Sequence, residues 1–219
     1  LPEEADSLDI IINEILFNPV DDGVDYVEIY NRSSKVIDMG KVYLGSLEMQ
    51  HNGLYDTVAK TITDGCMQLL PGSYLLLTKN ADKVAGQYPV SDPSAFFEMS
   101  SFPSFPNESG DVLLLDRRNR IFDVLHYHEN MHYPLLYSLE GVALEKINHE
   151  FSSLDRANWA SASETSGFGT PGIINSQYTD HVASDNRLML QPRVFSPNGD
   201  GIDDVLLISY SFTVPELNV

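Results

Sequence analysis

Three histidines lie close together in the sequence, with a spacing that could bind a metal ion. His126 and His128 are separated by one residue, so in a β-strand both side chains would lie on the same face, and His132 follows shortly after. Three imidazoles with a fourth ligand complete a tetrahedral zinc site. No cysteine lies nearby, and Glu129 is the one neighbouring acid. Surface histidines on a half-exposed strand are therefore the alternative to a zinc site.

A second candidate metal site lies near the C-terminus. Its four oxygen donors are closely spaced around glycines, an arrangement typical of calcium loops: Asn198, Asp200, Asp203 and Asp204. No glutamate stands where an EF-hand places its bidentate ligand, so a tight Asn-Gly or Asp-Gly turn is the alternative. We expect no cofactor, and calcium is the candidate to test.

Residues 167–172 satisfy the spacing G-x-G-x-x-G of dinucleotide-binding loops. In those proteins the loop follows a buried strand and opens a helix whose N-terminus holds the pyrophosphate. Here a serine-rich stretch precedes the glycines and Pro171 lies among them. The segment is therefore predicted to be a turn.

No combination of residues points to catalysis. The chain contains neither G-x-S-x-G nor H-E-x-x-H, and acidic pairs such as Asp21 and Asp22 are uninformative among 32 Asp and Glu residues. We therefore predict a protein that is not an enzyme and has no catalytic residues. The two catalytic carboxylates of a glycosidase are recognised by the distance between them in the folded protein, so the sequence leaves this class of enzyme open.

The net charge of −19 argues against nucleic acid as a partner. Proteins that bind nucleic acid gain most of their affinity from basic side chains that neutralise phosphates. The densest basic cluster, Arg117, Arg118 and Arg120, lies between Asp116 and Asp123. It is predicted to be a solvated turn between two strands.

Short apolar runs of strand length must position the candidate residues named above. They are rich in Val, Ile, Leu and Tyr, and turn residues separate them: 10–17, 25–31, 42–47, 74–78, 112–115, 121–127 and 142–147. Within 25–31, Val27 and Ile29 alternate with Tyr26, Glu28 and Tyr30. Seven such runs without intervening long helices predict a β-sandwich.

One long connection, residues 80–109, interrupts the strands. Residues 81–88 could form a helical turn, and four prolines exclude a regular central strand or helix in the rest. Phe96, Phe97, Phe102 and Phe105 would be costly to leave in water, so we expect this connection to cap the core.

A set of motifs occurs in a fixed order along the chain. It opens with Ile12-Asn13-Glu14-Ile15, Asn18-Pro19 and 25–31, and it closes with 141–147, Asn158-Trp159, 169–172 and Asn175. Together these motifs resemble a lamin tail domain of the type found in bacterial exported proteins. The resemblance implies an immunoglobulin-like β-sandwich without catalytic residues. It assigns structural roles to Asn13, Glu14, Asp25, Glu28, Asn31, Trp159, Thr170, Pro171, Gly172 and Asn175.

The fold class we predict is all-β: a lamin-tail-like sandwich with a C-terminal partial β-domain or hairpin. Residues 1–8 are predicted to be an N-terminal linker, 9–176 the sandwich, 177–187 a second linker and 188–219 the truncated start of another domain. That last segment contains two strand-like runs, 188–194 and 205–210, joined by Ser196-Pro-Asn-Gly-Asp-Gly-Ile-Asp-Asp204. With these features it resembles the immunoglobulin-like domain that closes flagellar hook-capping and gliding-motility proteins. Its exposed strand edges could pair with another copy to form a dimer.

We expect a non-catalytic structural or interaction module of an exported or cell-surface bacterial protein, acting in spacing, anchoring or adhesion. The alternative is an accessory domain of a larger secreted hydrolase, such as a nuclease or phosphoesterase. Expected partners are other domains of the same chain and a surface protein or glycan, with no nucleic acid and no membrane span. The location is expected to be extracytoplasmic; the single cysteine, Cys66, allows no internal disulfide.

Overall fold

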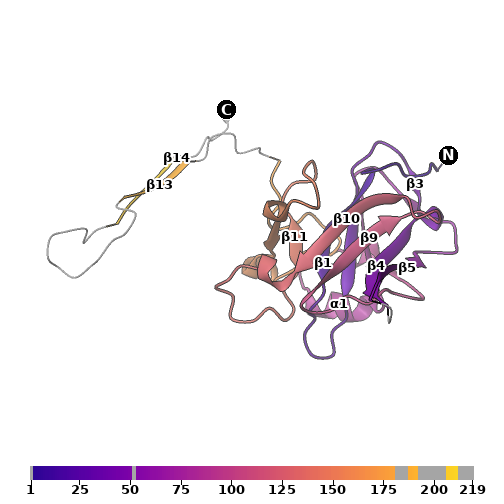
Figure 1. The fold of residues 1–219 in the computed structure, drawn as a ribbon, viewed down its shortest axis with the longest axis horizontal. Helices are drawn as coiled ribbons and strands as arrows, with labels where there is room; N and C mark the ends of the chain where they lie inside the picture. Colours follow the sequence, from indigo (N-terminus) through magenta and orange to yellow (C-terminus); the bar gives the residue numbers. More distant parts are fainter. Residues whose placement is uncertain (1, 51–52, 181–186, 192–205, 212–219) are drawn as a thin grey trace. The chain divides into compact units, whose positions relative to one another are not determined.

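The structure is a computed structural model that describes residues 2–50, 53–180, 187–191 and 206–211 (Figure 1). The chain divides into two units, Leu1–Tyr178 and Thr179–Val219. Each unit is described by itself.

Two antiparallel-rich sheets form the first unit. The six-stranded sheet has the order β12-β11-β1-β2-β7-β8, and the four-stranded sheet has the order β10-β9-β4-β5. The strands of the first sheet are β1 (Ile10–Leu16), β2 (Tyr26–Asn31), β7 (Tyr74–Thr78), β8 (Phe96–Glu98), β11 (Leu144–Lys146) and β12 (Trp159–Ser161). Those of the second are β4 (Tyr43–Met49), β5 (Tyr55–Thr61), β9 (Ser109–Leu115) and β10 (Ile121–His128).

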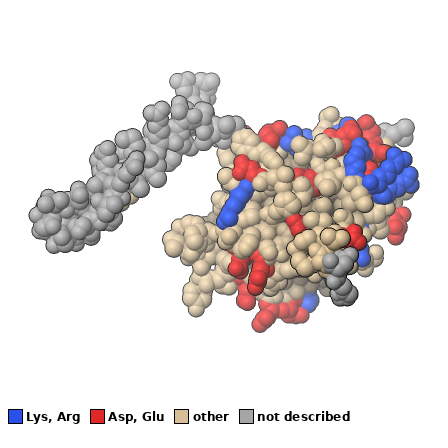
Figure 2. All heavy atoms as spheres, in the orientation of Figure 1, with Lys and Arg blue, Asp and Glu red and all other residues tan. Residues whose placement is uncertain are grey.

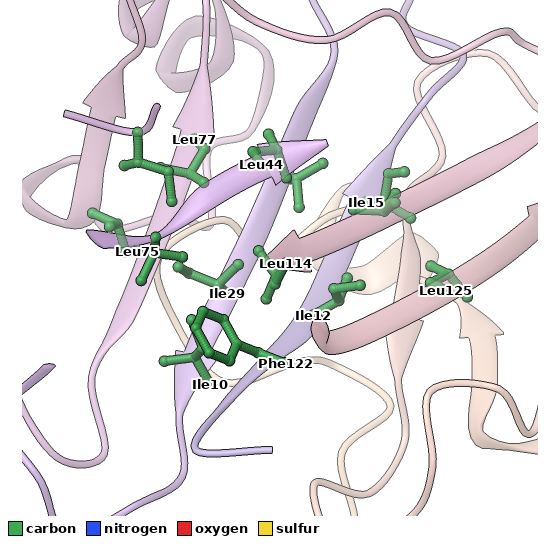
Figure 3. Close-up of a cluster of buried hydrophobic side chains, with 14 of the residues drawn as sticks. Ile10, Ile12, Ile15, Ile29, Leu44, Leu75, Leu77, Leu114, Phe122 and Leu125 are labelled. Carbon is green, nitrogen blue, oxygen red and sulfur yellow. The ribbon is translucent and has the colours of Figure 1, made fainter. Parts of the chain in front are cut away.

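The core lies between the two sheets, and alternating side chains build it from both sides. Ile10, Ile12, Ile15, Ile29, Leu75 and Leu77 come from the six-stranded sheet, and Leu44, Leu114, Phe122 and Leu125 come from the four-stranded sheet (Figure 3). A register shift between Ile12 and Glu14 lets Ile12 and Ile15 share this core although they are three residues apart. The predicted all-β, immunoglobulin-like sandwich is confirmed.

A second apolar cluster contains residues of the six-stranded sheet and of helix α1 (Ala81–Gln87). Its members are Leu16, Tyr26, Leu76, Val84, Tyr88, Ala143 and Ala162. Helix α1 begins where the Asn80 side chain accepts a hydrogen bond from the Lys83 amide, and Val84 is its buried residue. Because Tyr26 alternates with Val27 along β2, this cluster lies on the face of the sheet that looks away from the core.

The long connection caps the core as predicted. Phe102 and Phe105 join the main cluster, while Phe97 and Phe96 pack against the main and second clusters respectively. The predicted helical turn is α1, and η2 (Pro93–Ala95) follows it. Strand β8 was not predicted; it pairs in parallel with β7 at the edge of the sheet, where neighbouring prolines are tolerated.

Several short or polar strands were also not predicted from the sequence. Strand β5 reads YDTVAKT, an edge strand whose polar residues hide the apolar alternation. Strands β3 (Ile37–Asp38) and β6 (Gln68–Leu69) form a two-residue pairing. The remaining turns are the 3-10 helices η1 (Met39–Lys41), η3 (Glu129–Met131), η4 (Arg156–Asn158) and η5 (Glu164–Ser166).

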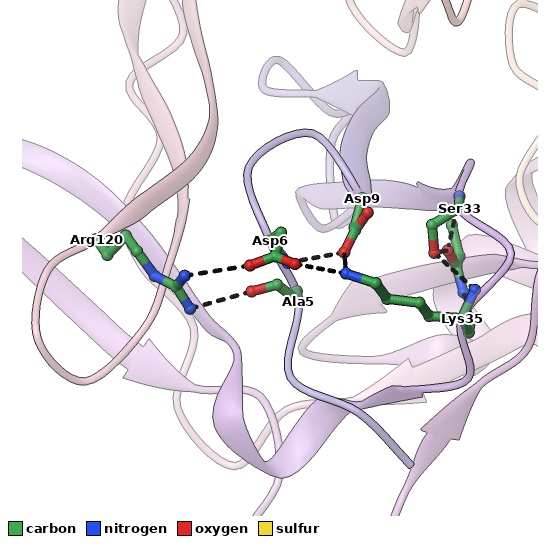
Figure 4. A network of polar contacts seen from close by, with 7 residues as sticks. Ala5, Asp6, Asp9, Ser33, Lys35 and Arg120 are labelled. Carbon is green, nitrogen blue, oxygen red and sulfur yellow. Dashed lines mark hydrogen bonds and ion pairs between the residues drawn. The ribbon is translucent and has the colours of Figure 1, made fainter. Parts of the chain in front are cut away.

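The segment before β1 is packed against the sandwich instead of forming the predicted linker. Glu3 bridges to Ile37, and Ala5 is buried in the main core. Figure 4 shows the polar side of this attachment: Asp6 lies between Arg120 and Lys35, and Lys35 also contacts Asp9 at 2.7 Å. Backbone pairing and ion pairs therefore hold a stretch whose composition looked like a linker.

The second unit contains one antiparallel pair among its described residues, β13 (Arg187–Gln191) with β14 (Leu207–Ser211). The sequence predicted strands over 188–194 and 205–210. The calcium candidates Asn198, Asp200, Asp203 and Asp204 lie outside the described residues. Among the residues that are described, no helix has the length and apolar character needed to cross a membrane.

Candidate functional site

Three buried glutamates lie side by side across three neighbouring strands. Glu14 on β1 is directly opposite Glu28 on β2 and Glu145 on β11, and all three side chains are fully buried. The register shift after Ile12 turns Glu14 away from the main core. Two of these residues belong to the predicted motif set, whereas Glu145 was not singled out as a site residue.

The glutamates bind the segment that follows β12 and η5. Glu28 accepts hydrogen bonds from the Gly172 amide and the Asn13 side chain. Glu145 accepts from the Ser176 hydroxyl and the Gln177 amide, both at 2.8 Å. The backbone near the end of the first unit is thus held by carboxyl groups of the sheet.

Thr170 connects two of the carboxyl groups in a way that requires a proton. Its hydroxyl lies 3.0 Å from one Glu14 oxygen and 2.7 Å from a Glu145 oxygen. A hydroxyl has one hydrogen to donate, so the other short contact needs a protonated carboxyl as donor. Burial and the neighbouring Glu145 carboxyl raise the pKa of Glu14 to about 8, and burial beside Glu14 raises the pKa of Glu28 well above its usual value.

This network has no room for a substrate in the conformation described. The three carboxyl groups are 0% exposed, and Tyr26, Thr170 and Gly172 occupy their oxygens. Buried polar groups that are fully hydrogen-bonded fix one arrangement of the chain, because each alternative leaves a group unsatisfied. The glutamates therefore lock the 170–177 segment onto the sheet.

We expect Thr170→Val to destabilise the first unit by about 2–4 kcal/mol, because it removes one hydroxyl from two buried carboxyls at nearly constant volume. Thr57→Val, on the half-buried edge strand β5, serves as the matched control and should change stability by less than about 0.5 kcal/mol. Urea unfolding followed by circular dichroism measures both. Equal stability of the two variants would contradict the bridging role.

Other residues of the predicted motif set form hydrogen bonds in and around the same sheet. Asn175 donates to the backbone carbonyls of Asn13 and Lys146, and it accepts from the Asn13 side chain at 2.7 Å. Asn31 accepts from the Ser33 amide and donates to Leu69, as expected for a residue that closes a strand. Asp25 lies immediately before β2, and its carbonyl accepts from the Thr78 hydroxyl.

Trp159 lies on the edge strand β12 above a second buried polar group that the sequence did not reveal. The Lys146 ammonium is 4.9 Å from the indole centroid and donates to Ser153, whose hydroxyl donates to Asp123. Burial lowers the pKa of Lys146 to about 8. A lysine beside a serine is also found in hydrolases, but Ser153 is buried here and its proton is held by Asp123.

The structure separates the three histidines. His126 contacts Asp111 on the outer face of β9–β10, and His128 accepts from the Asn130 amide at the start of η3. His132 is buried against Phe17, and burial lowers its pKa to about 4. Among the described residues, no group of three or more His, Cys, Asp or Glu could hold a metal, so the predicted zinc set is not assembled there.

The glycines of 167–172 have packing roles. Gly167 ends η5 with a positive φ of 78°, and a Cβ on Gly169 would come within 2.5 Å of the Tyr88 ring. Gly172 has φ of 85° and faces the Asp92 carbonyl, and Pro171 accepts from the Asp92 amide. No helix follows them among the described residues, which agrees with the predicted turn.

An open cleft lies where the four-stranded sheet divides. Strands β4 and β9 pair only from Tyr43 to Gly45, after which β4 pairs with β5 alone and the start of β9 pairs with β10 alone. Residues 46–49 and 109–111 border the resulting space, which has a volume of about 700 Å³. The connection that caps the core adds Ser104 and Pro106 to its wall.

The cleft combines aromatic and hydrogen-bonding groups. Tyr55 is 63% exposed at its edge, and Tyr127 is buried with its hydroxyl donating to Pro106. Ser46 is 2% exposed, and its buried hydroxyl has no hydrogen-bond partner among the residues that the structure describes. Polar groups are otherwise supplied by Glu48, Ser104, Ser109, Asp111 and His126. The wall thus combines aromatic and apolar surface with a similar number of polar residues.

Sequence reasoning found His126 but did not connect it with this cleft. A usable signal was present, because Asp111 and His126 stand opposite each other on the hairpin that turns at 116–120. The point at which β4 separates from β9 cannot be predicted from the sequence of either strand alone. Comparisons with protein-family models and with curated proteins found no match.

Proposed function

We propose that the first unit is a non-catalytic binding module, and that the cleft between β4 and β9 holds a neutral saccharide. The observation that carries the proposal is the open cleft itself, in which the exposed ring of Tyr55 lies beside carboxylate and hydroxyl groups.

These groups of the cleft favour a ligand rich in hydroxyls. Tyr55 offers an exposed ring on which the apolar face of a sugar can stack, while Glu48 and Asp111 accept hydrogen bonds from hydroxyl groups. Two carboxylates and one histidine give the wall a negative charge near neutral pH. Acidic glycans would therefore be repelled, and neutral ones are preferred.

In a longer chain, this binding would serve adhesion or anchoring, with the sandwich as the rigid support. The lamin-tail resemblance and the exported, cell-surface location remain part of this proposal. The alternative role, as an accessory domain of a larger secreted hydrolase, would use the same cleft to hold the substrate of another domain. The domain content of the full-length protein distinguishes the two.

An array of neutral and acidic oligosaccharides tests the proposal with the full chain and two variants. We expect binding to neutral glycans, an approximately tenfold loss of affinity in Tyr55→Ala, and no loss in Tyr133→Ala, an equally exposed tyrosine that does not line the cleft. Absence of binding to every glycan, or equal losses in both variants, would overturn it.

Ser46→Ala tests the packing beneath the cleft. Because the Ser46 hydroxyl has no hydrogen-bond partner among the described residues, its removal should leave the free energy of unfolding unchanged or raise it by up to about 2 kcal/mol. The Ser46 hydroxyl is buried and not accessible from the cleft, so affinity for the bound glycan should be nearly unchanged. Urea unfolding and glycan titration measure the two effects, and a large loss of affinity in a stable variant would show that the ligand reaches this hydroxyl.

A further inference from the structure

Basic residues gather in one pocket of a strongly acidic chain. Of the 13 Lys and Arg residues, four line a pocket of about 640 Å³. They are Lys41, Arg117, Arg118 and Arg120. Figure 2 shows a dense blue patch in the region where Figure 1 places β3 and the N-terminus. Two acids, Glu4 and Asp116, also line the pocket, so its lining carries a net charge of about +2 near neutral pH.

The turn between β9 and β10 is built to present two of these residues. One Asp116 oxygen accepts from the amides of Arg118 and Arg120, at 2.7 and 2.9 Å, and the other accepts from the Arg120 guanidinium. Asn119 adopts a left-handed conformation with φ of 60° and donates its amide to the Asp116 carbonyl. The turn is therefore ordered by its own hydrogen bonds before any ligand arrives.

The other two cations are already engaged and form the walls. The Arg120 guanidinium donates to the Ala5 carbonyl at 3.1 Å and lies 5.3 Å from the Phe122 ring centroid (Figure 4 shows its contacts with Ala5 and Asp6). Lys41 forms an ion pair with Glu4 at 3.1 Å. These contacts attach the N-terminal segment and fix one side of the pocket.

Arg117 and Arg118 differ from them. Both are exposed, and within the described ranges of the chain neither side chain forms an ion pair or hydrogen bond. A guanidinium presents several donors in a planar fork that matches the oxygens of phosphate, sulfate or carboxylate. Two such groups on a preordered turn, at the rim of a pocket with Tyr43 and Phe122 in its lining, form an arrangement suited to an oxyanion.

We propose that this pocket binds a compact oxyanion group, the phosphate or sulfate ester of a small ligand or glycan, through Arg117 and Arg118. The negative charge of the whole chain favours a compact anion over a long one. A screened interaction reaches about 8 Å at physiological salt, so a group held inside the pocket is governed by the local positive charge. A long polyanion extends over the acidic remainder of a chain at −19 and is repelled.

The oxyanion pocket is independent of the saccharide cleft. The cleft is bordered by the end of β4 and the start of β9, whereas the pocket contains Tyr43 at the start of β4 and Asp116 just after β9. None of the residues that line one lines the other. Loss of either activity therefore leaves the other to be measured.

Isothermal titration of the full chain with four probes tests the proposal: inorganic phosphate, a sugar phosphate, a sulfated disaccharide and a duplex DNA of 20 base pairs. We expect at least one of the three small probes to bind, and to bind more tightly than the DNA. Binding to inorganic phosphate alone would indicate a site for the free ion, and stronger binding to either ester would identify the ester.

Two double variants with the same change in charge complete the test. Arg117→Glu with Arg118→Glu should lower the affinity for the bound probe at least tenfold, whereas Lys60→Glu with Lys79→Glu, outside the pocket, should change it less than twofold. Thermal melting verifies that both fold. The proposal is wrong if no small probe binds, if DNA binds more tightly, or if both double variants lose affinity equally.

Discussion

Glu14→Gln is expected to remove much of the pH dependence of stability in the first unit. Glu14 has a pKa raised from 4.5 to about 8 in the folded protein, because it is buried and faces Glu145. The folded state therefore binds more protons than the unfolded state between these values, and the free energy of unfolding falls as the pH rises. The stabilisation that the raised pKa of Glu14 contributes is fully present below about pH 4.5, and it is lost as the pH rises through 8.

The pH-dependent contribution of Glu14 to the free energy of unfolding should amount to several kcal/mol, because each tenfold change in proton affinity corresponds to about 1.4 kcal/mol. Glutamine imitates the protonated carboxyl, since its amide oxygen can accept from Tyr26 and from the Thr170 amide while its NH₂ group donates to the Thr170 hydroxyl. We expect the variant to lie within about 2 kcal/mol of the native protein at pH 5. At pH 9 it should be the more stable of the two.

Urea unfolding between pH 5 and 9 provides the measurement. An acidic chain also loses stability with rising pH through general repulsion, so Glu140→Gln, an exposed site, is the control for charge. Native protein and this control should share the steep decline. Equal slopes in all three proteins would show that Glu14 is ionised in the folded state and that the shared-proton arrangement is wrong.

Gly172→Ala is expected to be the most destabilising single methyl addition, by more than about 3 kcal/mol. Gly172 has φ of 85°, where a Cβ is strained, and that Cβ would overlap the Asp92 carbonyl group. Any shift that relieves the overlap also moves the Gly172 amide away from Glu28, which it contacts as a donor. Steric overlap and loss of a buried hydrogen bond therefore add together.

Gly86→Ala is the matched control for this substitution. Gly86 lies within α1, and apart from its own helix no described residue has an atom within 4 Å of the position its Cβ would take. Alanine is preferred over glycine in helices, so stability should rise by up to about 1 kcal/mol. Thermal melting of both variants checks the prediction. A small effect at Gly172 would mean that the 170–177 segment is not held in the arrangement described.

The sandwich was predictable because its central strands are short apolar runs, rich in Val, Ile, Leu and Tyr, that turn residues separate. Tyr74–Thr78 agrees with the sequence prediction at both ends, and β1 differs by a single residue. Strand β5 was missed because both faces of this edge strand carry polar residues, as in Asp56 and Thr57. The N-terminal segment was misread as a linker because its attachment depends on partners such as Ile37 and Arg120, far along the chain.

The candidate sites depend on pairing across long distances in the sequence. Glu14 and Glu28 were assigned structural roles by the resemblance, but their donors, Thr170 and Gly172, lie more than 140 residues away. Glu145 joins them only through the register of β1 with β11. The cleft arises where β4 leaves β9, a property of two strands together that neither sequence segment carries alone.

The most direct test of the proposed function is a map of where a neutral saccharide binds. Amide resonances of the full, ¹⁵N-labelled chain are followed while the neutral oligosaccharide with the strongest array signal is added. We expect saturable shifts at residues 46–49, 104–111 and 126–127, with Arg117 and Arg118 unaffected. Shifts confined to other surfaces, or none at saturating saccharide, would contradict the assignment of the β4–β9 cleft as the binding site.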